Sequence, residues 1–153
     1  MRILLGADLA PGAATLSLGF AGALNPRLVG YYASTYRDET GAEHTLAATH
    51  FESTDARRAF PCFDEPEMKA VFAVSLVVDD GIFAVSNARE IGREPAGPGR
   101  TRIRYADSMR MSTYLVAMVV GPLVATEPAY ANTTPMRIVH VPGREHLTQF
   151  GLD

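Results

Sequence analysis

The feature that most constrains the fold is a short-range alternation of apolar and other residues that recurs along the chain. In residues 14–20 leucine and phenylalanine alternate with small or polar residues, and in residues 101–105 apolar residues alternate with arginines. Side chains two apart in a strand share a face, so each segment can bury one face and expose the other. The pattern predicts an all-β fold of mostly antiparallel strands.

Turn-forming residues separate the expected strands. Residues 71–78 are strongly apolar and β-branched, which favours a central strand, and the Asp-Gly pair at residues 80–81 favours a hairpin into residues 82–87. Residues 92–99 hold two prolines and three glycines and are expected to form a loop. The remaining strands are expected at residues 28–36, 43–52, 114–120 and 136–141. Short strands at this spacing favour a β-sandwich or an open barrel.

One short helix is expected near residues 54–59. Ser53 and Thr54 supply capping hydroxyls, Asp55 lies in the first turn, and Pro61 stops the helix. Alternation ends at Gly143, and residues 144–153 are too short to fold alone.

Composition excludes several classes of protein. At 153 residues and 47% hydrophobic residues the chain can form one domain with a real core. The net charge of −3 argues against a nucleic-acid partner. Cys62 is the single cysteine, so no internal disulfide can form. Between Pro61 and Phe63, we expect it to act as a buried apolar side chain rather than a nucleophile.

No membrane segment or leader is expected. The longest apolar run, residues 115–120, is far short of the roughly 20 residues that a membrane helix needs. Asp8 interrupts the N-terminus before a secretory core could form. We therefore expect a cytoplasmic location.

Common catalytic motifs are absent from the sequence. It contains no H-E-x-x-H, no G-x-S-x-G, no phosphate-binding loop and no G-x-G-x-x-G. The four histidines are scattered, so we expect no metal ligand, no bound cofactor and no catalytic residue in this chain.

His50 and Glu52 form the one pair that suggests binding. They are two apart in an expected strand, so both would face one side, next to the small side chain of Ala48. A carboxylate beside an imidazole can accept hydrogen bonds from an ammonium group. By pattern alone the alternative, a solvated strand end with an ordinary glutamate, is the favoured interpretation, because exposed glutamates are common.

A charge-dense turn follows this pair. Asp55, Arg57, Arg58, Asp64 and Glu65 surround the expected helix and the proline-bounded turn after it. We interpret them as a structural network, because ion pairs around a rigid turn can fix its geometry even where each contributes little energy.

Several segments together resemble the zinc aminopeptidase family typified by aminopeptidase N. The most specific is THFESTDARRAFPCFDEP at residues 49–66, followed by KAVF at 69–72. GYYASTY at 30–36, AVSN at 84–87 and MSTYLVA at 111–117 resemble other segments of that family. The resemblance extends from about residue 9 to residue 141.

The resemblance implies a saddle-shaped N-terminal β domain that covers the active site of a separate catalytic domain. Residues 1–143 would form this domain, incomplete at its N-terminus, and residues 144–153 would begin the missing catalytic domain. That domain would hold the zinc ion with H-E-x-x-H, and it would be the main partner of this chain. Alone, the chain would lack peptidase activity.

The same resemblance assigns a role to two residues. Glu52 matches the family's glutamate that contacts the free α-amino group of a peptide substrate. His50 stands where a glutamine commonly lines the first specificity pocket, and Ser53 replaces a proline. Peptide N-termini are therefore the expected ligands.

Two alternatives remain open. The chain can be a stand-alone β-sandwich module that binds peptides or proteins without catalysis, or a structural domain without a ligand. If the family's first strands and catalytic domain are missing, strand edges left unpaired and the uncovered face of the domain would favour self-association or poor solubility.

Overall fold

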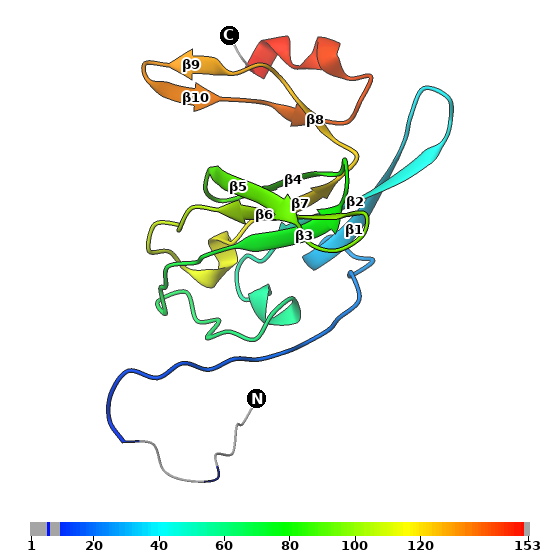
Figure 1. Ribbon diagram of the computed structural model, residues 1–153. Coiled ribbons are helices and arrows are strands. Elements are labelled where there is room, and N and C mark those ends of the chain that lie inside the picture. The colour runs from blue at the N-terminus through cyan, green and yellow to red at the C-terminus, as the bar shows by residue number, and fades with distance from the viewer. Residues whose placement is uncertain (1–5, 7–9, 152–153) are drawn as a thin grey trace.

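The computed structural model describes residue 6 and residues 10–151, which form antiparallel sheets joined by short connections (Figure 1). The larger sheet has four strands in the order β1-β2-β7-β4. Its strands are β1 (Gly30–Arg37), β2 (Glu43–His50), β7 (Met118–Gly121) and β4 (Phe83–Ser86). β1 and β2 pair over their full length, from Gly30 opposite His50 to Arg37 opposite Glu43.

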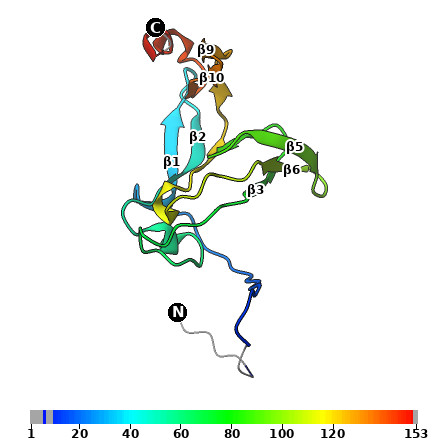
Figure 2. The ribbon, with the colours of Figure 1, turned by 90° about the vertical axis from the view of Figure 1, so that its left-hand side faces the viewer.

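A three-stranded sheet has the order β3-β6-β5 and is inclined to β1 and β2 (Figure 2). Its strands are β3 (Ser75–Asp79), β6 (Arg100–Tyr105) and β5 (Glu90–Pro95). A shift in register between Glu90 and Gly92 interrupts the pairing of β5 with β6.

Apolar side chains from both sheets form one core cluster. Ile103 of β6 is fully buried and packs with Val78 of β3 and Ala84 of β4. Val120 of β7 covers the same cluster. Because each strand contributes alternate residues, the cluster uses only one face of each sheet.

The C-terminal part of the described residues forms a separate small layer above the sheets (Figure 1). Two short antiparallel pairs make it, β8 with β11 and β9 with β10. The strands are β8 (Val124–Ala125), β9 (Ala129–Ala131), β10 (Thr134–Met136) and β11 (Val139–His140). The described residues also form single-turn 3-10 helices: η1 (Ala56–Arg58), η2 (Thr113–Leu115), η3 (Glu145–Leu147) and η4 (Gln149–Gly151).

The prediction of an all-β fold with mostly antiparallel strands is confirmed, and the described residues form no closed barrel. The strands expected at residues 28–36, 43–52 and 101–105 correspond to β1, β2 and β6. The expected helix near residues 54–59 is present only as the single turn η1.

The hairpin predicted at residues 79–87 is wrong. Ile82 does donate its N–H to the carbonyl of Asp79 (3.2 Å), and Gly81 has a φ of 82°. The flanking strands nevertheless enter different sheets, because β3 pairs with β6 and β4 pairs with β7. The local sequence determines the turn, but long-range pairing determines where the strands go.

The central strand predicted at residues 71–78 is also wrong. β3 begins only at Ser75 and lies at the edge of its sheet. Val71 and Val77 are about half exposed, at 55% and 45%. The apolar residues at 71–78 therefore contribute side chains to the exposed surface as well as to the core.

Other boundaries differ from the predictions. The first half of the loop expected at residues 92–99 belongs to β5, and only residues 96–99 turn between β5 and β6. The strand expected at 114–120 is divided into η2 and β7, and the one expected at 136–141 into the ends of β10 and β11.

The strand predicted at residues 14–20 is not formed, and no other described segment pairs with these residues. This segment belongs to an extended stretch that runs away from the sheets (Figure 1). The first bridge to β1 is a parallel one between Asn25 and Tyr32. Because a strand needs a neighbour for its backbone hydrogen bonds, the alternation alone does not form a strand here.

Candidate functional site

The second apolar cluster fixes the end of β2, where the candidate binding residues lie. Phe51, which is 1% exposed, directly follows β2 and packs edge-to-face against Phe60, with ring centroids 5.9 Å apart. Ala56, Met111 and Val116 complete the buried centre of this cluster. The backbone N–H of Asp55 donates to the carbonyl of Phe51 (2.9 Å), so the chain turns immediately after the anchor.

His50 and Glu52 flank this anchor and are both exposed. Nδ1 of His50 lies 3.0 Å from the carbonyl oxygen of Leu28, which orients the imidazole ring. A cis peptide bond joins Glu52 to Ser53. Within the described part of the chain, the Glu52 carboxylate has no hydrogen-bond or ion-pair partner, so its oxygens are free to accept from a ligand.

β2 ends at His50, so Glu52 lies in the following turn rather than in the predicted strand. The burial of Phe51, not strand alternation alone, holds the backbone on both sides of it. Gly30 opposes His50 on β1 with a φ of 76°, and a Cβ there would lie 3.3 Å from Cβ of Arg58. A glycine therefore suits this close approach of β1 to η1.

Asp64 is the centre of the predicted charged turn and is 2% exposed. Its carboxylate accepts hydrogen bonds from the backbone N–H of Arg57 (3.0 Å), from Nε of Arg57 (3.0 Å) and from the hydroxyl of Thr113 (2.6 Å). Its carbonyl accepts a further bond from Arg57 (3.2 Å). The residues of η1, the turn and η2 are thus joined through one buried carboxylate.

Burial raises the pKa of Asp64, but the hydrogen bonds from Thr113 and Arg57 outweigh it and hold the pKa below its usual value. The carboxylate is therefore charged at neutral pH. The hydroxyl of Ser112 donates to the carbonyl of Pro66 and adds a second link between the turn and η2.

The other members of the predicted turn network are peripheral. Asp55 accepts an ion-paired hydrogen bond from Arg58, whose side chain is 61% exposed. Glu65 is exposed, and its carbonyl accepts from the N–H of Met68 (2.8 Å). The network therefore has one buried centre, Asp64, and one more exposed ion pair, Asp55 with Arg58.

Cys62 lies partly buried beside this network. Burial, together with the negative charge of Asp64, raises the pKa of the Cys62 thiol to about 11. Few of the molecules then carry a thiolate at neutral pH, which disfavours a nucleophilic role.

We expect the thiol of Cys62 to react with iodoacetamide at pH 8 about tenfold or more slowly than a free cysteine, because its smaller thiolate fraction outweighs the higher nucleophilicity of a more basic thiolate. Mass spectrometry of timed samples measures the rate. The chain unfolded in urea is the control and should react at the ordinary rate. An ordinary rate in the folded chain would contradict the raised pKa.

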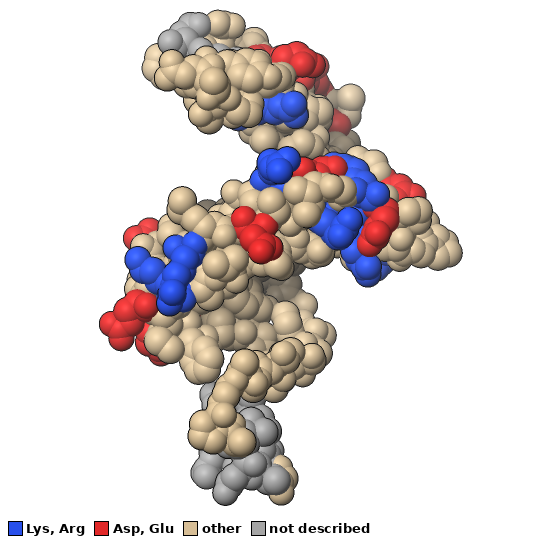
Figure 3. Space-filling view, turned by 60° about the vertical axis from the view of Figure 1, so that its left-hand side comes forward, with Lys and Arg blue, Asp and Glu red and all other residues tan. Residues whose placement is uncertain are grey.

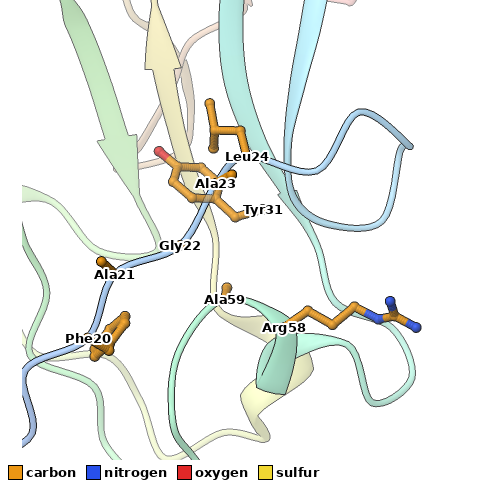
Figure 4. Close-up of a pocket in the computed structure, with 8 residues that line it drawn as sticks. All are labelled: Phe20, Ala21, Gly22, Ala23, Leu24, Tyr31, Arg58 and Ala59. Atoms are coloured by element: carbon orange, nitrogen blue, oxygen red, sulfur yellow. The ribbon is translucent and has the colours of Figure 1, made fainter.

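The extended N-terminal stretch passes over η1 and leaves a small pocket of about 210 Å³ (Figure 4). Phe20 and Leu24 approach from the stretch, and Tyr31 and Ala59 lie opposite. The aliphatic part of Arg58 also lines this pocket. A larger groove of about 810 Å³ continues from it between the stretch and the turn.

A metal site does not fit the residues that the structure describes. Among them, no group of three or more His, Cys, Asp or Glu side chains lies close enough to hold a metal ion. The helices found in the same residues are too short to cross a bilayer.

The segment that contains Phe51 and Asp64 also matches a known protein family. The model of the peptidase M1 N-terminal domain matches residues 2–115, which include β1, β2, η1 and the Asp64 turn. The chain belongs to the peptidase M1 family. The match covers the N-terminal domain of that family.

Whole-chain relatives are aminopeptidases. The chain is 41% identical to the puromycin-sensitive aminopeptidase of Caenorhabditis elegans, an alignment that covers 100% of this chain and 16% of the relative. It is 41% identical to mitochondrial aminopeptidase 2 of Saccharomyces cerevisiae (93% and 15%) and 40% identical to aminopeptidase M1-B of Oryza sativa (97% and 17%). The chain thus spans about one sixth of the length of these relatives.

Sequence reasoning on this M1 domain missed Thr113 and Ser112. Both are buried and bind the turn at Asp64 and Pro66, which lie 49 and 46 residues earlier. They belong to the segment that resembles the family, MSTYLVA, but nothing local in that segment indicates a partner in the turn. Only the fold brings them together.

Proposed function

We propose that this chain is the substrate-facing N-terminal domain of a zinc aminopeptidase, in which Glu52 binds the free α-amino group of a peptide. The observation that carries the proposal is the exposed Glu52 carboxylate, which directly follows the buried anchor Phe51 and has no hydrogen-bond or ion-pair partner among the described residues. The family membership supports an aminopeptidase as the parent enzyme.

The chemistry of an exopeptidase supports this role for Glu52. Such an enzyme must accept a terminal ammonium group and reject an internal amide. A fixed carboxylate accepts charge-assisted hydrogen bonds from the ammonium and is left unpaired when the amine is blocked. His50, oriented by the Leu28 carbonyl, would line the adjoining pocket for the first side chain.

In this proposal the zinc ion and the catalytic groups lie in a separate domain. The described residues hold no set of metal ligands, so we assign no step of hydrolysis to them. Residues 1–143 would form the N-terminal domain, and residues 144–153 would begin the connection to the catalytic domain. Zinc would supply Lewis-acid chemistry there.

The test is Glu52→Gln in the full-length aminopeptidase that carries this domain. We expect kcat/KM for an aminoacyl anilide to fall about 10- to 100-fold, because a hydrogen bond to a charged group contributes roughly 1.5–3 kcal/mol. The N-acetylated anilide, which lacks the ammonium group, should lose little of its already low rate. Unchanged kcat/KM for the free amine would refute the assignment.

Glu67→Gln is a matched control. Glu67 is also an exposed glutamate, but it lies beyond the Asp64 turn, so its loss should leave kcat/KM unchanged. The 153-residue chain by itself should hydrolyse neither substrate. Turnover by the isolated chain that survives repurification and is abolished by a chelator would contradict the proposed division of labour.

A further inference from the structure

The backbone before Glu52 is held by a segment that lies far along the chain, residues 111–118. The hydroxyl of Thr49 accepts a hydrogen bond from the backbone N–H of Met118 (3.0 Å). Phe51, directly before Glu52, packs in the buried cluster to which the same segment contributes apolar side chains. Two contacts with residues 111–118 therefore fix the backbone on this side of Glu52.

The same segment holds the backbone after Glu52, and it does so through Asp64. The helix η1 follows this turn, and its N-cap residue, Asp55, makes no capping hydrogen bond with its side chain. The Asp64 carboxylate satisfies the first turn instead, because one of its oxygens accepts from the backbone N–H of Arg57 (3.0 Å). The hydroxyl of Thr113 donates to the other oxygen (2.6 Å). Thr113 thus holds the group that caps η1.

The bond between Thr113 and Asp64 is buried. Thr113 is 3% exposed and Asp64 is 2% exposed, so bulk water does not reach the place that the hydroxyl occupies. A buried carboxylate oxygen that loses its donor is strongly disfavoured, so the carboxylate would move to find another donor. Its other donors belong to Arg57 of η1, so this movement would shift η1 and the turn in which Glu52 lies.

We propose that Thr113 is a positioning residue for the reaction: through Asp64 and η1 it holds the Glu52 carboxylate where the ammonium group of the substrate binds. This inference rests on the proposed function of Glu52. The Glu52 carboxylate has no hydrogen-bond or ion-pair partner among the described residues, so within them only its backbone sets its position. A displacement of about 1 Å in a group that positions a substrate can cost about 100-fold in rate, which makes the support of this backbone important for activity.

The test is Thr113→Val in the full-length aminopeptidase that carries this domain. Valine keeps the branched shape of threonine but lacks the hydroxyl, so Asp64 loses one donor. We expect kcat/KM for an aminoacyl anilide to fall about tenfold. Thr113→Ser retains a hydroxyl and should keep kcat/KM within about twofold of the value for the natural enzyme.

A double-mutant cycle with Glu52→Gln separates positioning from a general loss of structure. Once the Glu52 carboxylate is gone, Thr113 has nothing to position, so Thr113→Val should lower kcat/KM by less than about twofold in that background. A purely structural role would lower kcat/KM by the same factor in both backgrounds, because a smaller folded fraction affects each enzyme alike. Thr113→Ala is a second variant with a smaller side chain, and it should show the same pattern if valine does not fit the interior.

Thr101→Val is a matched control. The hydroxyl of Thr101 also donates to an aspartate carboxylate, that of Asp80, at 2.6 Å. Thr101 belongs to β6 in the β3-β6-β5 sheet, whose surface shows positive and negative side chains next to each other (Figure 3). Neither residue belongs to the cluster of Phe51. The loss of this bond should leave kcat/KM within about twofold of the natural value.

Three results would overturn the inference. One is an unchanged kcat/KM in Thr113→Val although Glu52→Gln lowers it. The second is an equal loss from Thr113→Val with and without the Glu52 carboxylate. The third is a Thr113→Ser enzyme that is as impaired as the valine variant. These results differ from a failure of the proposed function, in which Glu52→Gln would itself leave kcat/KM unchanged.

Discussion

Replacing Phe51 with alanine is expected to lower the free energy of unfolding by about 3–5 kcal/mol. Phe51 is 1% exposed, and it is one of the two largest fully buried side chains among the described residues. Its ring packs edge-to-face on Phe60 and against Met111 and Val116. The shortened side chain would leave a cavity that strands and turns on both sides cannot close. Urea unfolding of the dilute chain measures the change.

Phe150→Ala is the control of the same residue type, because Phe150 is 95% exposed. Its effect should stay within about 0.5 kcal/mol. Equal effects of the two substitutions would mean that the cluster around Phe51 is not a core. In the full-length enzyme, the milder Phe51→Leu should lower kcat/KM through a displaced Glu52 while leaving much of the stability in place.

Asp64→Asn is expected to cost about 2–3 kcal/mol of the free energy of unfolding at pH 7. The carboxylate is almost fully buried and accepts bonds from Thr113 and from Arg57. The amide can replace one acceptor but supplies neither the second anionic oxygen nor the charge. The Arg57 side chain is 54% exposed, so water can hydrate its guanidinium group when the carboxylate is gone. This hydration limits the loss of stability.

The pH dependence provides a second measurement on Asp64. Its pKa is lower in the folded chain than in the unfolded chain, where a value of about 3.9 is ordinary. The stabilisation is therefore fully present at neutral pH and is lost as pH falls below about 4 through the folded pKa. The difference in stability between the natural chain and Asp64→Asn should shrink at low pH.

Asp55→Asn is the matched control for this carboxylate. Asp55 pairs with Arg58 near η1, as Asp64 pairs with Arg57, but the Arg58 side chain is 61% exposed and the Asp55 side chain 24%. We expect a loss of less than about 1 kcal/mol. A loss at Asp55 as large as that at Asp64 would show that burial is not what distinguishes the two pairs.

The sequence predicted those strands that bury one face in a core and expose the other. β1, β2 and β6 correspond to the segments expected from alternation, because a period of two is a local property that does not depend on which strand lies alongside. The segment at residues 14–20 shows the limit of this signal. Its alternation is as regular, yet it forms no strand, because no described segment accepts its backbone hydrogen bonds.

The candidate site was predictable in part. Residues 49–66 resemble the family closely enough to single out His50 and Glu52, and family membership is shown by residues 2–115. The roles of Glu52 and His50 stay predictions until the enzyme is measured. The local sequence shows that residues around Asp64 are charged, but it does not show that Asp64 is buried. The hydroxyl that binds the buried carboxylate belongs to Thr113, which lies far along the chain.

By itself, the sequence determined the all-β class, the family and the position of the possible amine-binding glutamate. These follow from local periodicity and from specific residue patterns, which do not require the chain to be folded. Only the tertiary structure decided that β3 and β4 enter different sheets, that Asp64 joins η1 to η2, and that residues 14–20 pair with no other described segment. Those outcomes depend on contacts between distant segments, whose energies no short stretch of sequence contains.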